Sequence, residues 1–109
     1  MIKLNSDPTF DVLVKLTVPG QLAPVEVPMV FRHMASDKLS GWFESNRDKN
    51  PADALDEIVA GWSGVMGDDG TMVAYSKNAL ALLLKNYQPA TAEILRAWQL
   101  GLSESRVKN

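Results

Sequence analysis

The sequence predicts an α+β fold in which an N-terminal antiparallel β-hairpin packs on about four α-helices. Two segments near the N-terminus alternate apolar and polar residues with the period of a β-strand. The rest of the chain carries apolar residues at helical spacing, with Pro and Gly at the ends of the repeats. At 109 residues we expect a single domain 1–109, made of a β-hairpin region 1–33 and a helical region 36–104.

The composition is that of an ordinary globular protein, and it narrows the possible functions. Hydrophobic residues make up 46% of the chain, which is enough for a small core. A net charge of -2 provides no basic field, so we expect no nucleic-acid partner. Without cysteine there are no disulfides, thiolate metal sites or thiol nucleophiles. The N-terminus lacks a signal-peptide segment and no apolar run could span a bilayer, so we expect no membrane partner.

The first predicted strand covers residues 9–18, where every second residue is apolar, as in a half-buried strand. Only Leu13 interrupts the polar face of this strand. Pro19-Gly20 breaks the alternation, and a second alternation follows over residues 25–32. Pro28 has no backbone N–H to donate, so we expect the second strand to lie at a sheet edge or to contain a bulge.

The first two helices are predicted from their caps and apolar stripes. Ser36 is a suitable N-cap for the first helix, and Asn50-Pro51 is a suitable start for the second. The first stripe consists of Leu39, Trp42 and Phe43, and the second of Leu55, Ile58, Val59 and Trp62. Because the second set follows the spacing i, i+3, i+4, i+7, we expect that helix to continue to Trp62.

The last two helices are predicted in the same way. Ser76 can cap a third helix, and Pro89 fits the first position of a fourth. Their stripes consist of Leu80, Leu83, Leu84 and Tyr87 in the third helix and Ile94, Leu95, Trp98 and Leu102 in the fourth. The two stripes provide more apolar surface than a two-stranded sheet would cover, although both could lie entirely in the core.

A glycine-rich segment, residues 61–76 (GWSGVMGDDGTMVAYS), separates the second and third helices. It lacks the Lys-Ser/Thr ending of a phosphate-binding loop. Asp68-Asp69-Gly70 lacks the alternating acids and final Glu of an EF-hand. Asp-Gly is a strong turn dipeptide, so we interpret the segment as a tight reversal, with a ligand loop as the alternative.

The remaining polar residues do not form a recognisable catalytic set. His33 is the only histidine, and we interpret it as a surface or junction residue. Asp53, Asp56 and Glu57 fall in a predicted helix near its N-terminus, where carboxylates complement the helix dipole. We therefore expect no catalytic residue, no metal ligand and no cofactor, and a protein that is not an enzyme.

The segment from Leu55 to Trp98 resembles the tail assembly chaperones of long-tailed bacteriophages. In that family a Trp is followed by Gly-Val, an Asp-Gly turn, an aromatic-Ser pair and a Leu-rich helix that closes on Tyr-Pro. The matching residues are Trp62, Gly64, Val65, Asp69, Gly70, Tyr75, Ser76, Leu80, Leu83, Leu84 and Tyr87, with Ile94 and Trp98 in the final helix. Ala74 stands where the family commonly has Pro, and Gln88 separates Tyr87 from Pro89.

The resemblance implies a non-enzymatic role in virion morphogenesis in the cytoplasm of the bacterial host. Such chaperones bind the long tape-measure protein and recruit tail-tube subunits, and many are also made in a longer, frameshifted form. We expect partner contacts at Leu80, Leu83, Leu84, Tyr87, Ile94 and Trp98, and self-association is possible. The alternative is a small regulatory or inhibitor domain that binds a single host or phage protein.

Overall fold

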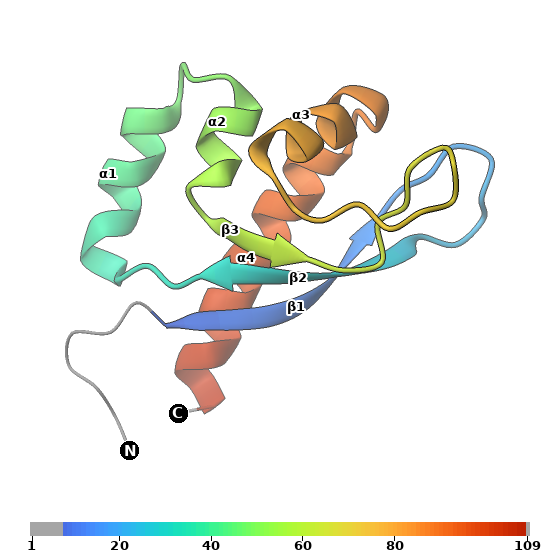
Figure 1. Ribbon diagram of the computed structural model, residues 1–109. Helices are drawn as coiled ribbons and strands as arrows, with labels where there is room; N and C mark the ends of the chain where they lie inside the picture. The colour runs from blue at the N-terminus through green and yellow to red at the C-terminus, as the bar shows by residue number, and fades with distance from the viewer. Residues whose placement is uncertain (1–7, 109) are drawn as a thin grey trace.

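The three strands β1 (Thr9–Leu16), β2 (Val25–Arg32) and β3 (Val59–Trp62) form an antiparallel sheet in the order β1-β2-β3 (Figure 1). Four helices accompany the sheet: α1 (Ser36–Asn46), α2 (Pro51–Asp56), α3 (Lys77–Asn86) and α4 (Ala90–Lys108). The computed structural model describes residues 8–108, so the start of the predicted 1–33 region lies outside the described residues. The α+β prediction, with an N-terminal hairpin and about four helices, is confirmed.

The β1–β2 hairpin forms because both strands place apolar side chains on the same face. Phe10 is paired with Phe31 and Val14 with Val27, so the apolar positions of the two strands coincide. Val14 and Phe31 are fully buried, whereas the alternate residues of both strands lie mostly exposed on the opposite face. The helices therefore pack on one face of the hairpin.

The predicted continuation of the second helix to Trp62 is wrong, because α2 ends at Asp56 and the chain enters β3. The backbone N–H of Arg32 donates to the carbonyl of Ile58 at 2.7 Å. The Arg32 guanidinium donates to the carbonyls of Asp56 at 3.1 Å and Val59 at 2.9 Å. These bonds satisfy the backbone carbonyls at the end of the helix. Beyond that point, hydrogen bonds to β2 replace the hydrogen bonds of the helix. The predicted helical region 36–104 therefore contains a strand.

Of the two alternatives expected for β2, the edge position is wrong, since β2 is the central strand, whereas the strand does contain an irregularity of the bulge type. The carbonyl of Pro28 accepts a hydrogen bond from the N–H of Ser63 at 3.0 Å. The backbone groups of Pro28 thus point toward β3 and not toward β1, so the missing N–H removes no hydrogen bond to β1. On the β3 side, the strand has already ended at this position. A register shift does occur, but between Val30 and Phe31, in the pairing with β3.

The helix starts agree largely with the predicted caps. The Asn50 side chain accepts a hydrogen bond from the N–H of Ala52 at 3.0 Å, and the Ser76 hydroxyl accepts one from the N–H of Ala79 at 3.0 Å. Ser36 is the first residue of α1 and not its cap, because Ala35 occupies that position without a side-chain bond.

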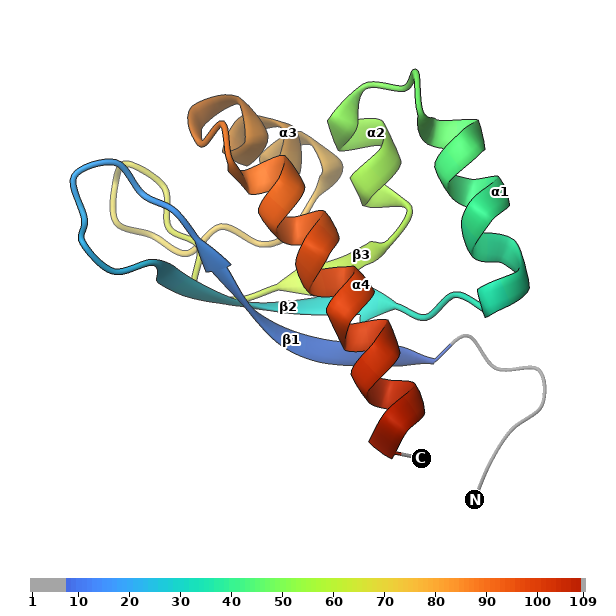
Figure 2. The ribbon, with the colours of Figure 1, turned by 180° about the vertical axis from the view of Figure 1, so that it is seen from behind.

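Helix α4 lies across the sheet and joins it to the other helices (Figure 2). The indole N–H of Trp98 donates to the carbonyl of Arg32 at 2.9 Å. Gly101 lets α4 approach β1 closely, since a Cβ there would stand 2.5 Å from Cε2 of Phe10. The apolar core contains Val14, Leu16, Val27, Met29, Phe31, Leu55, Ile58, Val59, Leu80, Ala90, Ile94, Trp98 and Leu102.

Candidate partner-binding site

The glycine-rich segment forms a closed reversal beyond the end of β3. The N–H of Gly70 donates to the carbonyl of Gly67 at 3.0 Å, and the N–H of Gly67 donates to the carbonyl of Thr71 at 2.9 Å. Gly64 and Gly70 have positive φ angles of 73° and 79°, which favour glycine. The N–H of Val73 donates to the carbonyl of Val65 at 2.8 Å and closes the base of the reversal.

Trp62 and Tyr75 connect this reversal to the helices. The Trp62 indole N–H donates to the carbonyl of Val73 at 2.9 Å, and its ring meets Tyr75 edge-on. The Tyr75 hydroxyl donates to Oδ1 of Asp56 at 2.6 Å. Burial, together with this hydrogen bond to Asp56, raises the pKa of Tyr75 well above its usual range. The pair therefore ties residues 61–76 to the end of α2.

The Asp69 side chain bonds within its own turn. Oδ1 of Asp69 accepts bonds from the Thr71 N–H at 3.0 Å and the Thr71 hydroxyl at 2.7 Å. These two bonds to Thr71 lower the pKa of Asp69. Within residues 8–108, no group of three or more His, Cys, Asp or Glu side chains is placed to hold a metal ion. The geometry is that of an Asp side chain stabilising its own turn.

The six residues expected to contact a partner fall into two groups. Leu80, Ile94 and Trp98 are fully buried, so in this folded state their side chains contact the core. Leu83, Leu84 and Tyr87 are half-buried and pack against the edge of that core. Only this second group presents atoms to solvent.

A second apolar surface lies at the junction of α1, α2 and α4. There the helices leave an open groove of about 600 Å³. The apolar side chains that line it are Trp42, Phe43, Pro51, Ala54, Leu55 and Leu95. Trp98 lies below the aromatic wall, with its ring centroid 5.2 Å from that of Trp42 and 6.2 Å from that of Phe43. The wall is thus supported from beneath by a fully buried ring.

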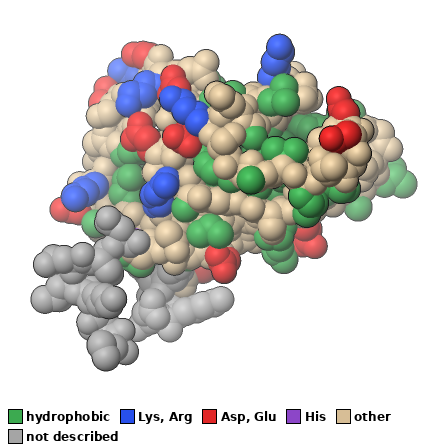
Figure 3. Space-filling model, viewed as in Figure 1, with side chains coloured by type: hydrophobic (Ala, Val, Ile, Leu, Met, Phe, Trp, Pro, Cys, Tyr) green, Lys and Arg blue, Asp and Glu red, His purple; other side chains and the backbone are tan. Residues whose placement is uncertain are grey.

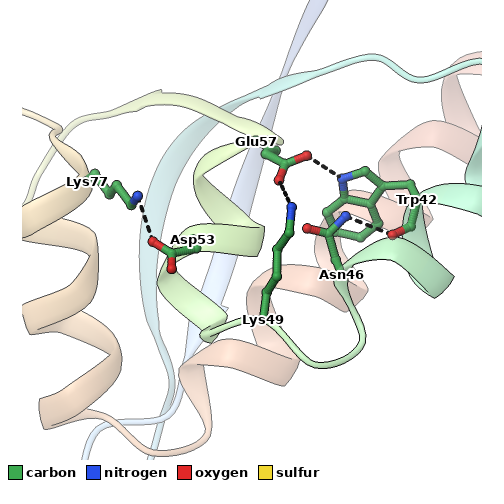
Figure 4. Close-up of polar contacts among 6 residues, drawn as sticks. All are labelled: Trp42, Asn46, Lys49, Asp53, Glu57 and Lys77. Carbon is green, nitrogen blue, oxygen red and sulfur yellow. Dashed lines mark hydrogen bonds and ion pairs between the residues drawn. The ribbon is translucent and has the colours of Figure 1, made fainter.

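Polar contacts hold the rim of the groove in place (Figure 4). Glu57 accepts a bond from the Trp42 indole N–H at 3.2 Å and pairs with the Lys49 ammonium at 3.1 Å. Asn46, in the groove lining, donates from Nδ2 to the carbonyl of Trp42 at 2.8 Å, while its buried Oδ1 has no partner among the described atoms. The bond from the indole to Glu57, whose carboxylate also pairs with Lys49, orients the Trp42 ring.

Charged side chains of both signs gather over α1 and α2 on the face drawn in Figure 3. Glu44, Arg47 and Lys49 are among the residues that line the groove. The Lys77 ammonium pairs with Asp53 at 2.6 Å, so one of the predicted N-terminal carboxylates links α2 to α3. This pairing raises the pKa of Lys77. His33 is exposed just beyond β2. Among the described helices, none combines the length and apolar character needed to cross a bilayer.

Sequence reasoning missed the groove because its residues come from three separate helices. The stripe of Leu39, Trp42 and Phe43 predicts one apolar helix face, but it does not show whether the core or a partner covers that face. Trp42 and Phe43 are half-buried, because they pack against the edge of the core and also line the groove. Adjacent aromatic residues on a short helix were the available signal, since exposed aromatic side chains often anchor partners.

The comparisons with known proteins give one match. A protein-family model described as phage tail assembly chaperone matches residues 1–109, the whole length of the chain. No curated protein and no solved structure matches it.

Proposed function

Because the chain belongs to the phage tail assembly chaperone family, we propose that it is a non-catalytic chaperone of tail morphogenesis. In this proposal it binds the tape-measure protein in the cytoplasm of the bacterial host, keeps that protein soluble and helps recruit tail-tube subunits. A long helical protein would aggregate if its apolar stripes stayed exposed, and a small domain can cover those stripes transiently. A frameshifted longer form of the chain is part of the same proposal.

The observation that carries the proposal is the open groove between α1, α2 and α4. A groove with Trp42 and Phe43 on one wall and Leu95 on the other suits apolar side chains projecting from one face of a helix. Its volume of about 600 Å³ is large enough for more than one such side chain. The charged rim allows the partner's polar flank to remain hydrated while its apolar stripe is buried.

Co-expression with the tape-measure protein of the same phage tests the proposal. The tape-measure protein is expected to move from the insoluble to the soluble fraction and to co-purify with this chain. Deleting residues 88–109 is a poor test, because it removes core residues such as Ile94 and Trp98. The point variant Ala54→Arg instead fills the groove from a half-buried position on a helix.

The matched control is Leu82→Arg, which places the same side chain on α3 at a residue 59% exposed and outside the groove. Ala54→Arg is expected to abolish the rescue while its circular dichroism spectrum stays native, and Leu82→Arg is expected to preserve it. A tape-measure protein that stays insoluble with the native chain and its lengthened form would reject the chaperone proposal. The inhibitor-domain alternative would then replace it.

A further inference from the structure

The outer edge of the sheet has an unusual order of side chains. Asp11 and Lys15 stand two positions to either side of Leu13, and Thr9 and Thr17 stand four positions away. Asp11, Leu13 and Lys15 all lie on the exposed face of β1, and Leu13 is 58% exposed. Two copies of this strand, paired antiparallel about Leu13, would place each Asp11 opposite a Lys15. Opposite charges in such cross-strand positions stabilise a sheet.

The backbone of β1 is available for such pairing. Within residues 8–108, no strand pairs with the side of β1 that faces away from β2. The backbone N–H of Arg32 points toward Ile58, away from β1, so its register partner Thr9 points its own backbone groups away from β2. Because this direction alternates along a strand, Asp11, Leu13 and Lys15 also point their backbone groups to the free edge. A row of unpaired ladder groups is a template for another strand.

The free edge has a defined end. The backbone N–H of Thr17 donates to both carboxylate oxygens of Glu93, at 3.0 and 3.2 Å, and the Thr17 hydroxyl donates to Oε2 at 2.6 Å. Glu93 therefore occupies the edge where β1 finishes. Within the part of the chain that the structure describes, no strand pairs with this edge from Asp11 to Lys15, a segment centred on Leu13.

Helix α4 has a similar order of charges beside the same edge. A groove of about 540 Å³ lies between β1 and α4, and its lining includes Leu13, Arg96, Leu100 and Glu104. Arg96 lies four residues before Leu100 and Glu104 lies four residues after it, so the three residues share one face of the helix. Leu100 is 58% exposed. The two-fold axis that relates antiparallel β1 strands of one continuous sheet is perpendicular to that sheet, so it reverses the direction of α4, which lies across the sheet face. Arg96 of one α4 would then approach Glu104 of the other.

We propose that β1 and α4 form the interface of a two-fold symmetric dimer of this chain. In the dimer β1 pairs with β1 of a second copy, so that the two sheets become continuous, and Leu100 packs near Leu100 of the second copy. Both elements carry opposite charges equidistant from an exposed leucine, which is the arrangement that an isologous interface requires. The dimer does not depend on the proposed chaperone function.

Sedimentation of the full chain over a range of concentrations tests the charge pairing. The native chain is expected to dimerise reversibly, and Asp11→Lys to weaken the dimer at least tenfold, because it places two lysines opposite each other. The double variant D11K/K15D restores opposite charges and is expected to restore the dimer. Lys15 also pairs in register with Glu26 of its own sheet, so K15D alone is the less clean variant. Asp37→Lys on α1 is the matched control and leaves the dimer unchanged.

Cross-linking tests the register, since the chain has no cysteine of its own. Leu13→Cys places two thiols opposite each other at the two-fold axis, within the Cα separation that a disulfide allows. It is expected to form a disulfide dimer much faster than Ser63→Cys, an exposed control outside the interface. A native chain that stays monomeric, or a dimer indifferent to Asp11→Lys with no faster cross-linking at Leu13→Cys, would overturn the proposal. If the chain is monomeric and the Leu13 amide is protected from hydrogen exchange only after a tail protein is added, the edge binds that protein. This outcome would also overturn the dimer proposal.

Discussion

Trp62 meets Tyr75 at a ring-centroid distance of 5.0 Å with an interplanar angle of 89°. The two residues lie at opposite ends of the reversal, and each also makes a polar bond, Trp62 to Val73 and Tyr75 to Asp56. An edge-to-face aromatic pair adds about 0.5–1.5 kcal/mol to the free energy of unfolding beyond the area it buries. The pair therefore holds residues 63–74 against the rest of the fold. This role explains why two aromatic residues flank a glycine-rich segment.

Truncating Trp62 is expected to destabilise the fold. Trp62→Ala removes the aromatic contact, the indole hydrogen bond and a half-buried ring, so the free energy of unfolding should fall by about 3 kcal/mol. Trp62→Phe keeps a ring but not the donor and should lose about 1 kcal/mol. Urea unfolding measures both. A urea midpoint for Trp62→Ala equal to that of the native chain would show that Trp62 does not hold this segment in place.

The stability of the fold is expected to fall at alkaline pH because of Tyr75. Its pKa is raised above the ordinary value of 10.0, so the native state holds the phenol proton more tightly than the unfolded chain does. This contribution is complete below pH 10 and is lost as the pH rises above it. Between pH 8 and about 11, the free energy of unfolding should fall more steeply for the native chain than for Tyr75→Phe.

Tyr87→Phe is the control for that titration, since it removes the other tyrosine hydroxyl of the chain. The exposed Lys77–Asp53 pair adds a smaller, salt-screened loss in the same direction, because the pKa of Lys77 is also raised. Both control and native chain keep this pair. An equal change of slope in Tyr75→Phe and Tyr87→Phe would contradict the role of Tyr75.

Two glycines in helices are expected to respond oppositely to the same substitution. Gly101→Ala places a methyl group 2.5 Å from Cε2 of Phe10 and 3.0 Å from Cγ2 of Val12, so α4 must shift and the chain should lose about 1–3 kcal/mol. Gly41→Ala in α1 meets no atom within 4 Å and should gain up to about 1 kcal/mol from helix propensity. Thermal melts of the two variants compare them directly. Equal melting temperatures would show that α4 does not approach β1 at Gly101.

Calcium or magnesium is expected to leave the melting temperature unchanged. Asp69 already directs Oδ1 to Thr71, and no metal-binding cluster occurs among residues 8–108. A metal that bound only the native state at a hundred times its Kd would stabilise it by about 2.7 kcal/mol. Metal-free protein titrated with either ion tests this. A saturable rise in melting temperature would identify a site that involves Asp68 or Asp69.

Local sequence patterns determined much of this fold. The alternation in β1 and β2 predicted the hairpin, because one strand face is buried and the other is hydrated. Asn50 and Ser76 predicted helix starts, because their side chains satisfy N–H groups within three residues. Those contacts lie close in sequence, so they could be read without knowing the rest of the chain.

Only the tertiary structure decided the segment that follows α2 and the groove beside it. Leu55, Ile58, Val59 and Trp62 fit a helical stripe, but β2 needs a partner along its second edge, and Arg32 supplies that pairing from more than 20 residues away. The groove likewise exists only because α1, α2 and α4 meet without filling the space between them. Both features depend on contacts between distant segments, and a local apolar period cannot distinguish a residue that faces the core from one that faces a partner.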